Sequence, residues 1–249
     1  MKSRPLIVAH RGFSARFPEN TMAAFFGALE AGAQMIELDV HLTRDGALIV
    51  THDFELGRTS SGAGSLSDHS SAELRRLDAG SWFGAGFQEE RFPVLGQVLA
   101  FAKGNVELNL ELKEETLVSP SAYEAMATKT LELVERHNML DKVLISSFDW
   151  KMLSVLREKN SRIRLGLLNH EPEKDLRWKE AAQIGAYSYH PHFKNLTASL
   201  VREISEKGLL LFPYTANTNA EFERLVILGA DGIITNEVAL LKFFLESQT

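Results

Sequence analysis

The chain has no cysteine among its 249 residues. Disulfide bonds, zinc–thiolate centres and thiol nucleophiles are therefore excluded. It also has no stretch approaching the ~20 consecutive apolar residues of a transmembrane helix, so we expect no stable membrane anchor. Its first residues, MKSRPLIVAHRG, contain no apolar segment of the kind that a signal peptide needs. With these features missing, a cytoplasmic location is the default expectation.

The chain also lacks an excess of basic residues. It has 33 acidic residues against 27 lysines and arginines, which gives a formal net charge of −6. Nucleic-acid-binding proteins usually carry a basic stripe, so we expect no nucleic-acid partner. An anionic substrate is still compatible with this balance, because a local cluster of cations can outweigh a distant surplus of acids. The composition, 45% hydrophobic and 24% charged, is that of an ordinary globular domain.

Short apolar runs alternate with helix-period segments along the chain. The predicted strands are Leu6–His10, Gln34–Val40, Val106–Leu112, Lys142–Ser146, Arg164–Leu168, Ala186–His190, Leu209–Tyr214 and Gly232–Thr235. The predicted helices are Thr21–Ala31, Val94–Ala102, Tyr123–His137, Trp150–Lys159, Leu176–Ile184, Ala198–Lys207, Ala220–Leu228 and Val238–Glu246. Such alternation predicts an α/β fold, a (β/α)8 TIM barrel that forms a single domain over residues 1–249. An open doubly wound sheet is the alternative.

One long insertion, residues 54–92, follows the second strand. Within it, SSGAGSLSD predicts a surface loop and SAELRRLDAG predicts a short helix that ends at Gly80. The usual loop between a strand and its helix has only about 2–6 residues, so this length is typical of a functional lid or rim. Its aromatic residues Trp82, Phe83 and Phe87 either close over the barrel mouth or pack over the acyl chains of a lipid substrate.

Acidic side chains share one face on two strands. Side chains two residues apart on a strand point the same way, so Glu37 and Asp39 project together. In VELNLELK the leucines are expected to contact the outer helices, and the polar positions then face the barrel interior. Glu111 and Lys113 would lie near the C-terminal rim, where barrel enzymes have their active sites.

Three carboxylates that converge in a low-dielectric site repel one another unless a cation lies between them. Oxygen ligands of this kind suit Mg²⁺ or Ca²⁺. We therefore predict one divalent cation, Mg²⁺ or Ca²⁺, bound by Glu37, Asp39 and Glu111. The alternative is a structural barrel with salt bridges, in which Glu111 pairs with Lys113 and the other acids pair with an arginine.

Histidines also occur near strand ends. His10 ends the first strand and is followed by Arg11, whose planar guanidinium matches phosphate, and by Gly12, which lets the backbone pass close to a ligand. His41 shares the face of the acidic pair but lies toward the turn, so we expect it at the rim or surface. Asp53 follows a further histidine and either orients that imidazole or caps a turn.

The segment IELDVHLTRDGALIVTHD is predicted to fold back on itself. A two-residue type I′ turn at Asp45-Gly46 would pair Arg44 with Ala47. In that register Asp39 lies opposite His52. The fold-back would then place an acid or base beside the carboxylate pair.

In order along the chain, AHRGFSARFPENT, GAQMIELDVHLTRDGALIVTHD, LNLELK, SSFD and GADGIITN resemble the motifs of glycerophosphodiester phosphodiesterases. The likeness covers nearly the whole chain, including the insertion. It implies a TIM barrel and metal-dependent cleavage of a small-molecule phosphodiester to sn-glycerol 3-phosphate and an alcohol. The residues that it implies are His10 and His52 for acid–base catalysis, Arg11 and Lys113 for phosphate, and Glu37, Asp39 and Glu111 for the metal.

We favour His10 as the base and His52 as the acid, with water or the glycerol 2-hydroxyl as the nucleophile. The chain departs from the family pattern in YTANTN (Tyr214 to Asn219) where Trp-Thr-Val-Asn is usual, at Asn236 in place of an aspartate, and at Gln97 in place of an acid. We expect that none of these touches the metal or histidine positions and that they affect the alcohol-side and rim contacts. A lysophospholipase D or phospholipase C, and a barrel that binds a phosphodiester without cleaving it, are the alternatives. The sequence carries no signal for an oligomeric state.

Overall fold

A computed structural model describes residues 4–170 and 177–248. Within these residues eight parallel strands form a barrel in the order β8-β7-β6-β5-β4-β2-β1-β9. Their bounds are β1 (Leu6–His10), β2 (Met35–Leu42), β4 (Glu107–Leu112), β5 (Val143–Ser147), β6 (Arg164–Asn169), β7 (Ser188–Pro191), β8 (Leu210–Leu211) and β9 (Gly232–Thr235). Backbone hydrogen bonds from Asp231 to Leu211 (2.9 Å) and from Ile234 to Pro213 (3.1 Å) connect β9 to the β8 segment. The predicted TIM barrel is confirmed.

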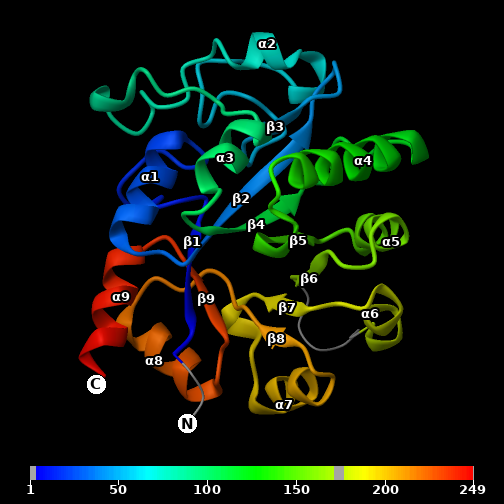
Figure 1. The fold of residues 1–249 in the computed structure, drawn as a ribbon. Helices are drawn as coiled ribbons and strands as arrows, with labels where there is room; N and C mark the ends of the chain where they lie inside the picture. The colour runs from blue at the N-terminus through cyan, green and yellow to red at the C-terminus, as the bar shows by residue number, and fades with distance from the viewer. Residues whose placement is uncertain (1–3, 171–176, 249) are drawn as a thin grey trace.

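Helices surround the strands (Figure 1). They are α1 (Met22–Ala31), α2 (Ser71–Leu74), α3 (Leu95–Ala102), α4 (Pro120–Arg136), α5 (Trp150–Lys159), α6 (Trp178–Ile184), α7 (Ala198–Glu206), α8 (Asn219–Leu228) and α9 (Val238–Ser247). Short 3-10 turns occur at Leu66–Asp68, Ala85–Phe87, Leu140–Lys142 and Phe193–Asn195. The predicted start of the sixth helix at Leu176 lies outside the described residues. None of the helices in the described ranges is long and apolar enough to cross a membrane.

Local signals explain where individual helices begin. The side chain of Thr21 accepts a hydrogen bond from the backbone N–H of Ala24, so Thr21 is the cap of α1. Helix α4 begins three residues before the predicted Tyr123, because Ser119 caps it and Pro120 takes the first helical position. Proline suits that position because it has no N–H that would be left without a partner.

The barrel has two apolar layers. The outward leucines of β4, Leu108, Leu110 and Leu112, are buried against the helices. A separate cluster from five different strand segments fills the barrel interior: Val8, Met35, Leu144, Phe212 and Ile234. The interior is therefore packed, and the polar residues that point inward at the C-terminal rim have an apolar floor beneath them.

Residues 54–92 pack around a core of their own. Leu66, Leu74, Ala79 and Phe92 pack with Ile49 of β3 (Leu48–Val50), which pairs with β2 as a hairpin strand. This segment lies to one side of the barrel, beside β3 (Figure 1).

The helix inside this insertion ends at Leu74, so the predicted end at Gly80 is wrong. The reason lies in the side chain of Asp78. It accepts the backbone N–H groups of Gly80 and Ser81 at 2.8 and 2.9 Å, and this local turn competes with a continued helix.

Candidate active site

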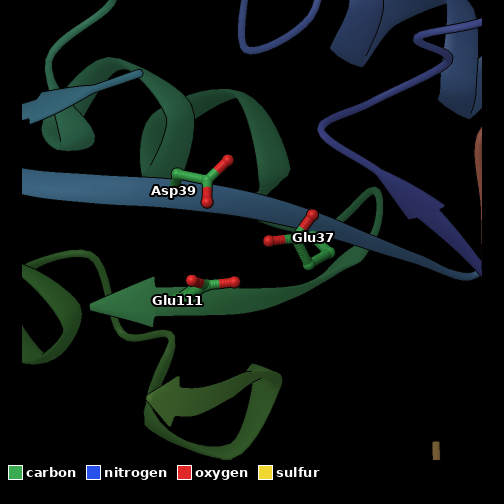
Figure 2. Close-up of side chains that lie close together, drawn as sticks. All are labelled: Glu37, Asp39 and Glu111. Atoms are coloured by element: carbon green, nitrogen blue, oxygen red, sulfur yellow. The ribbon is translucent and has the colours of Figure 1, made fainter. Parts of the chain in front are cut away.

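The three predicted acids lie together at the C-terminal end of neighbouring strands. Glu37 and Asp39 are on β2, and Asp39 is in register with Glu111 on β4. Figure 2 shows the three carboxyl groups close to one another. Each offers an oxygen within 4.8 Å of the others. Glu37 and Asp39 are 3% and 1% exposed. The period of two along a strand therefore brings the three acids to one place, as predicted.

Burial and mutual repulsion set the charge of this cluster. Burial, and then the neighbouring charge of Asp39, raises the pKa of Glu37 well above its usual value, and the same two causes raise the pKa of Glu111. Burial opposes ionisation of Asp39 as well, but Arg11 and Lys113 hold its pKa at about 2. Asp39 is therefore firmly ionised, and added positive charge would lower the pKa of Glu37 and Glu111 and favour their ionisation.

The cluster has the properties of a site for a hard divalent cation. Salt bridges do form, as the alternative interpretation required: Lys113 Nζ lies 2.9 Å from Glu111 Oε1, and Arg11 Nε lies 3.4 Å from Asp39 Oδ2. They do not satisfy Glu37, whose Oε1 is buried and has no hydrogen-bond partner among the described residues. A buried acceptor without a partner is costly, and every atom that could coordinate a metal here is a carboxylate oxygen, so the cluster fits a hard divalent cation.

Arg11 connects β1 to the acidic cluster. Its backbone is left-handed (φ 57°), and its N–H donates to Glu37 Oε2 at 2.9 Å. Its guanidinium binds Glu19 at 2.9 Å. Gly12 is left-handed too, and a Cβ there would lie 2.7 Å from Ala24 of α1. The structure gives Gly12 a packing reason, the close approach to helix α1, and the expected approach of its backbone to a ligand stays a prediction.

His10 faces the same cavity as the acids. Its Nδ1 lies 2.6 Å from Asn236 Oδ1, which also accepts from Ser14 Oγ at 3.0 Å. Because an amide oxygen only accepts, Nδ1 carries the proton and Nε2 is left to accept one. Burial, and then the charge of Arg11, lowers the pKa of His10 to about 4, so the imidazole is neutral at pH 7. Asn236 thus contacts His10, contrary to the expectation that the departures from the family pattern leave the histidine positions untouched.

The hairpin that carries His52 has a different register from the predicted one. Its loop has three residues, Thr43 pairs with Ala47, and the N–H of Thr51 donates to Asp39 O at 3.1 Å. The prediction that Asp39 lies opposite His52 is therefore wrong by one residue. Gly46, with a left-handed backbone (φ 71°), ends this three-residue loop, and the hydroxyl of Thr43 accepts the N–H of Ala47 across it at 2.9 Å.

His52 nevertheless reaches the cavity, because the chain leaves the strand after Val50. Its carbonyl accepts a hydrogen bond from His41 Nε2 at 3.1 Å. His41 is fully buried, so the prediction that places it at the rim or surface is wrong. Asp53 Oδ1 lies 2.7 Å from His52 Nδ1, so of its two predicted roles the structure supports orientation of the imidazole.

An ion-pair network that was not predicted from the sequence holds the pair His52 and Asp53, the His52–Asp53 dyad, in place. Arg58, from the insertion, binds Asp53 through both its Nε and Nη2. The same guanidinium binds Glu19 at 2.7 and 3.2 Å, and Glu19 in turn binds Arg11. The network thus joins the segment after β1 to the segment after β3. Arg58 follows Asp53 by only five residues, and this short spacing is what could have indicated the ion pair from the sequence.

Several of these side chains border one cavity of about 470 Å³. Its charged side comprises His10, Arg11, Glu37, His52, Glu111 and Lys113. Its other side includes four rings: Phe148, His170 and His192, each directly after a strand, and Tyr214, three residues beyond β8. Of these four, only Tyr214 was indicated by the sequence, through its place in YTANTN. Asp39 and its neighbour Asn20, which donates to Asp39 Oδ2 at 2.8 Å, lie behind the charged side.

The insertion does not cover this cavity. None of the described lining residues comes from 54–92. Phe87 instead contacts Phe17 (5.8 Å between ring centroids), and Phe83 and Trp82 extend the same cluster. The expectation that these aromatic residues close over the barrel mouth is therefore wrong, and they give no support to a platform for acyl chains. The insertion contributes to the rim instead, through the contacts of Arg58 with Glu19 and Asp53.

Comparisons with known proteins agree with this arrangement. The Glycerophosphoryl diester phosphodiesterase family matches residues 10–240. A glycerophosphodiester phosphodiesterase of Caldanaerobacter subterraneus subsp. tengcongensis is 37% identical over 94% of this chain and 95% of its own. One from Bacillus subtilis is 34% identical over 94% of this chain and 84% of its own.

Solved structures are similar over the whole barrel. An Oleispira antarctica phosphodiesterase in complex with the product sn-glycerol-3-phosphate has a TM-score of 0.90 and 27% identity, and the match covers 97% of each chain. The family match spans the barrel from His10 of β1 into α9. This chain belongs to the glycerophosphoryl diester phosphodiesterase family.

Proposed function

We propose that this phosphoric diester hydrolase cleaves glycerophosphodiesters to sn-glycerol 3-phosphate and an alcohol, with a divalent cation and two histidines. One observation carries the proposal: a single cavity is lined by both histidines, by the basic side chains of Arg11 and Lys113, and by two of the three clustered acids. The relatives named glycerophosphodiester phosphodiesterase support the substrate class, and the Oleispira complex supports the product.

Glu37, Asp39 and Glu111 would hold the cation, Mg²⁺ or Ca²⁺, which when bound neutralises negative charge on the phosphodiester. Arg11 and Lys113 bring two further positive charges to the same place. Each is anchored by a carboxylate, Arg11 by Glu19 and Lys113 by Glu111. Anchored charges need little reorganisation as negative charge grows on the phosphoryl oxygens, which is the condition for strong electrostatic stabilisation.

The histidines have complementary roles in this proposal. His10 is neutral with its Nδ1 proton held by Asn236, so its Nε2 can take a proton from water or from the glycerol 2-hydroxyl. His52 has a carboxylate, Asp53, 2.7 Å from its Nδ1, which orients the imidazole and leaves Nε2 as the ring atom that can carry a proton to the substrate. It can therefore give a proton to the oxygen of the leaving alcohol.

The test is hydrolysis of glycerophosphocholine by the purified chain, with sn-glycerol 3-phosphate and phosphocholine measured separately. We expect sn-glycerol 3-phosphate to form with Mg²⁺ or Ca²⁺ and to stop forming after chelation. His10→Ala and His52→Ala should each lower the rate by about 10²-fold or more, the usual contribution of general acid–base groups. His137→Ala, at the end of α4, is the matched control and should keep full activity.

Phosphocholine as the product would show cleavage on the other side of phosphorus and contradict the proposal. Background rates with every divalent cation would contradict it as well. Losses below ~10²-fold in both histidine variants, with unchanged circular dichroism, would remove the acid–base assignment alone.

A further inference from the structure

The four rings opposite the charged side form one continuous wall. Phe148 follows β5, His170 follows β6, His192 follows β7 and Tyr214 lies beyond β8. Phe148 and His170 are stacked, with centroids 3.8 Å apart and planes at 6°. Tyr214 is perpendicular to Phe148 (6.0 Å, 83°) and to His192 (5.7 Å, 87°). We call these four residues the aromatic wall.

The wall is fixed in place and carries little charge of its own. The hydroxyl of Tyr214 lies 3.1 Å from His170 Nδ1 and donates to Asn169 O at 3.2 Å. Burial, and then the charge of Glu111, raises the pKa of Tyr214, so the phenol stays protonated. Burial, and then Lys194, lowers the pKa of His192, so that ring is neutral at pH 7. The wall therefore presents mainly π surface to the cavity.

Two acids stand beside this wall without a cation of their own. Glu114 and Glu115 follow β4 and line the same cavity. Neither forms a salt bridge with any residue in the described ranges, and the adjacent Lys113 is held by Glu111 and Asp39. Burial and the charges of Asp149 and Glu115 raise the pKa of Glu114, which shows an excess of negative charge there.

We propose that the aromatic wall, with Glu114 and Glu115, binds the alcohol part of the substrate and selects an alkylammonium alcohol such as choline or ethanolamine. This rests on the proposed function, because the charged side must hold the phosphate for the alcohol to reach the wall. An alkylammonium is attracted to ring faces within about 6 Å, and to carboxylates. The wall itself offers a neutral polyol few hydrogen-bond partners, because the Tyr214 hydroxyl already contacts Asn169 O and His170 Nδ1.

The experiment compares two substrates that differ in charge alone. One is glycerophosphocholine, and the other is the 3,3-dimethylbutyl ester of sn-glycerol 3-phosphate, in which carbon replaces the ammonium nitrogen. We expect kcat/KM to favour the choline ester by about tenfold, within the range of a partly desolvated cation–π contact. If the kcat/KM values of the two esters differ by less than about twofold, the inference is overturned, because a cation–π contact would discriminate between them more strongly.

Two variants test the two parts of the site. Phe148→Leu removes π surface but keeps an apolar side chain, and Glu114→Gln/Glu115→Gln removes the charges. Each should lower the preference for choline, measured as the ratio of kcat/KM on the two esters, by about threefold or more, whatever its effect on the rate with the neutral ester. The controls are Phe26→Leu, an exposed ring on α1, and Glu132→Gln/Glu158→Gln, two exposed acids on α4 and α5. A preference unchanged in both site variants would overturn the inference.

Binding measurements separate this inference from the proposed function. Isothermal titration calorimetry of the His52→Ala variant with the same two esters requires no turnover. Tighter binding of the choline ester, with no hydrolysis by the wild-type protein, would contradict the proposed function and support the selective site. Equal binding of both esters, with normal hydrolysis by the wild type, would contradict the selective site and leave the function standing.

Discussion

The two halves of the barrel mouth contain different kinds of side chain, buried charges in one and packed rings in the other. The half from β1, β2 and β4 concentrates buried charges, among them Glu37, Asp39 and Arg11, and each is bound to at least one other group. The half from β5 to β8 presents stacked and perpendicular rings such as Phe148 and Tyr214. Buried charges cost desolvation free energy, whereas packed rings lower the free energy of the fold. Substitutions in the first half should therefore lower activity while raising stability, and substitutions in the second half should alter selectivity for the alcohol.

The largest effect is expected for Glu37→Gln. Its carboxyl is the acid whose pKa burial and Asp39 raise most clearly, and its Oε1 has no partner in the described structure. We expect cation binding to be lost and kcat/KM to fall by about a thousandfold, since metal stabilisation of transition-state charge is worth several kcal/mol. Without metal, the variant should be at least as stable as the wild type, because one source of repulsion is gone.

Calorimetric cation titration and thermal melts with and without Mg²⁺ or Ca²⁺ check both expectations. Glu107→Gln is the matched control, because Glu107 lies on the inward face at the other end of β4 and pairs with Arg164. A Glu37→Gln variant whose melting temperature still rises on addition of cation would show that the acids are not the cation site.

Arg58→Gln should have the next largest effect. It removes the guanidinium that ties Asp53 to Glu19, and with it the support of the His52–Asp53 dyad. Losing a group that orients a functional residue typically costs about 10- to 100-fold, and we expect this in kcat more than in KM. Arg44→Gln is the control, because Arg44 is bound to Glu73 at the surface next to the same insertion.

The arginine variant also tests the role of His52. A p-nitrophenyl leaving group needs no proton, so the loss should be much smaller on a p-nitrophenyl ester of sn-glycerol 3-phosphate than on glycerophosphocholine. Equal losses on both esters would assign Arg58 to phosphate binding or general stability instead.

Asn236→Asp should shift the pH dependence. The pKa of His10 is about 4, lowered by burial and Arg11, and a base is active in its neutral form, so activity rises as pH rises through that value. A carboxylate at Asn236 would favour the protonated imidazole and raise this pKa by about one unit or more. The acidic limb of kcat/KM against pH should therefore move to higher pH, while the rates near pH 8 change little. A limb that moves to lower pH, or stays in place, would contradict the role of His10 as base.

The sequence predicted the charged half better than the aromatic half, for a physical reason. Glu37 and Asp39 share a strand, and the period of two alone indicates that they project together. The rings come from four strands, and one aromatic residue after one strand carries no signal of the other three. The contact between His10 and Asn236 spans 226 positions and was invisible for the same reason.

The errors in the hairpin had local causes that residue types alone do not determine. A two-residue turn and a three-residue loop both place Gly46 at a left-handed position. The choice between them depends on Thr43, whose hydroxyl accepts the N–H of Ala47 at 2.9 Å. That one-residue shift also explains His41, since its ring is buried where it donates to the carbonyl of His52.

The smallest effect tests whether the two halves are independent. Phe148 lines the cavity beside His170 and Tyr214, and none of the described contacts of its ring involves Glu37, Asp39 or Glu111. Phe148→Leu should therefore change the affinity for Mg²⁺ or Ca²⁺ by less than about twofold, because effects at sites without shared partners are usually separate. Calorimetric titration of the cation measures this directly. A loss of tenfold or more would show that the rings support the acids, and selectivity for the alcohol could then not be altered without weakening the cation site.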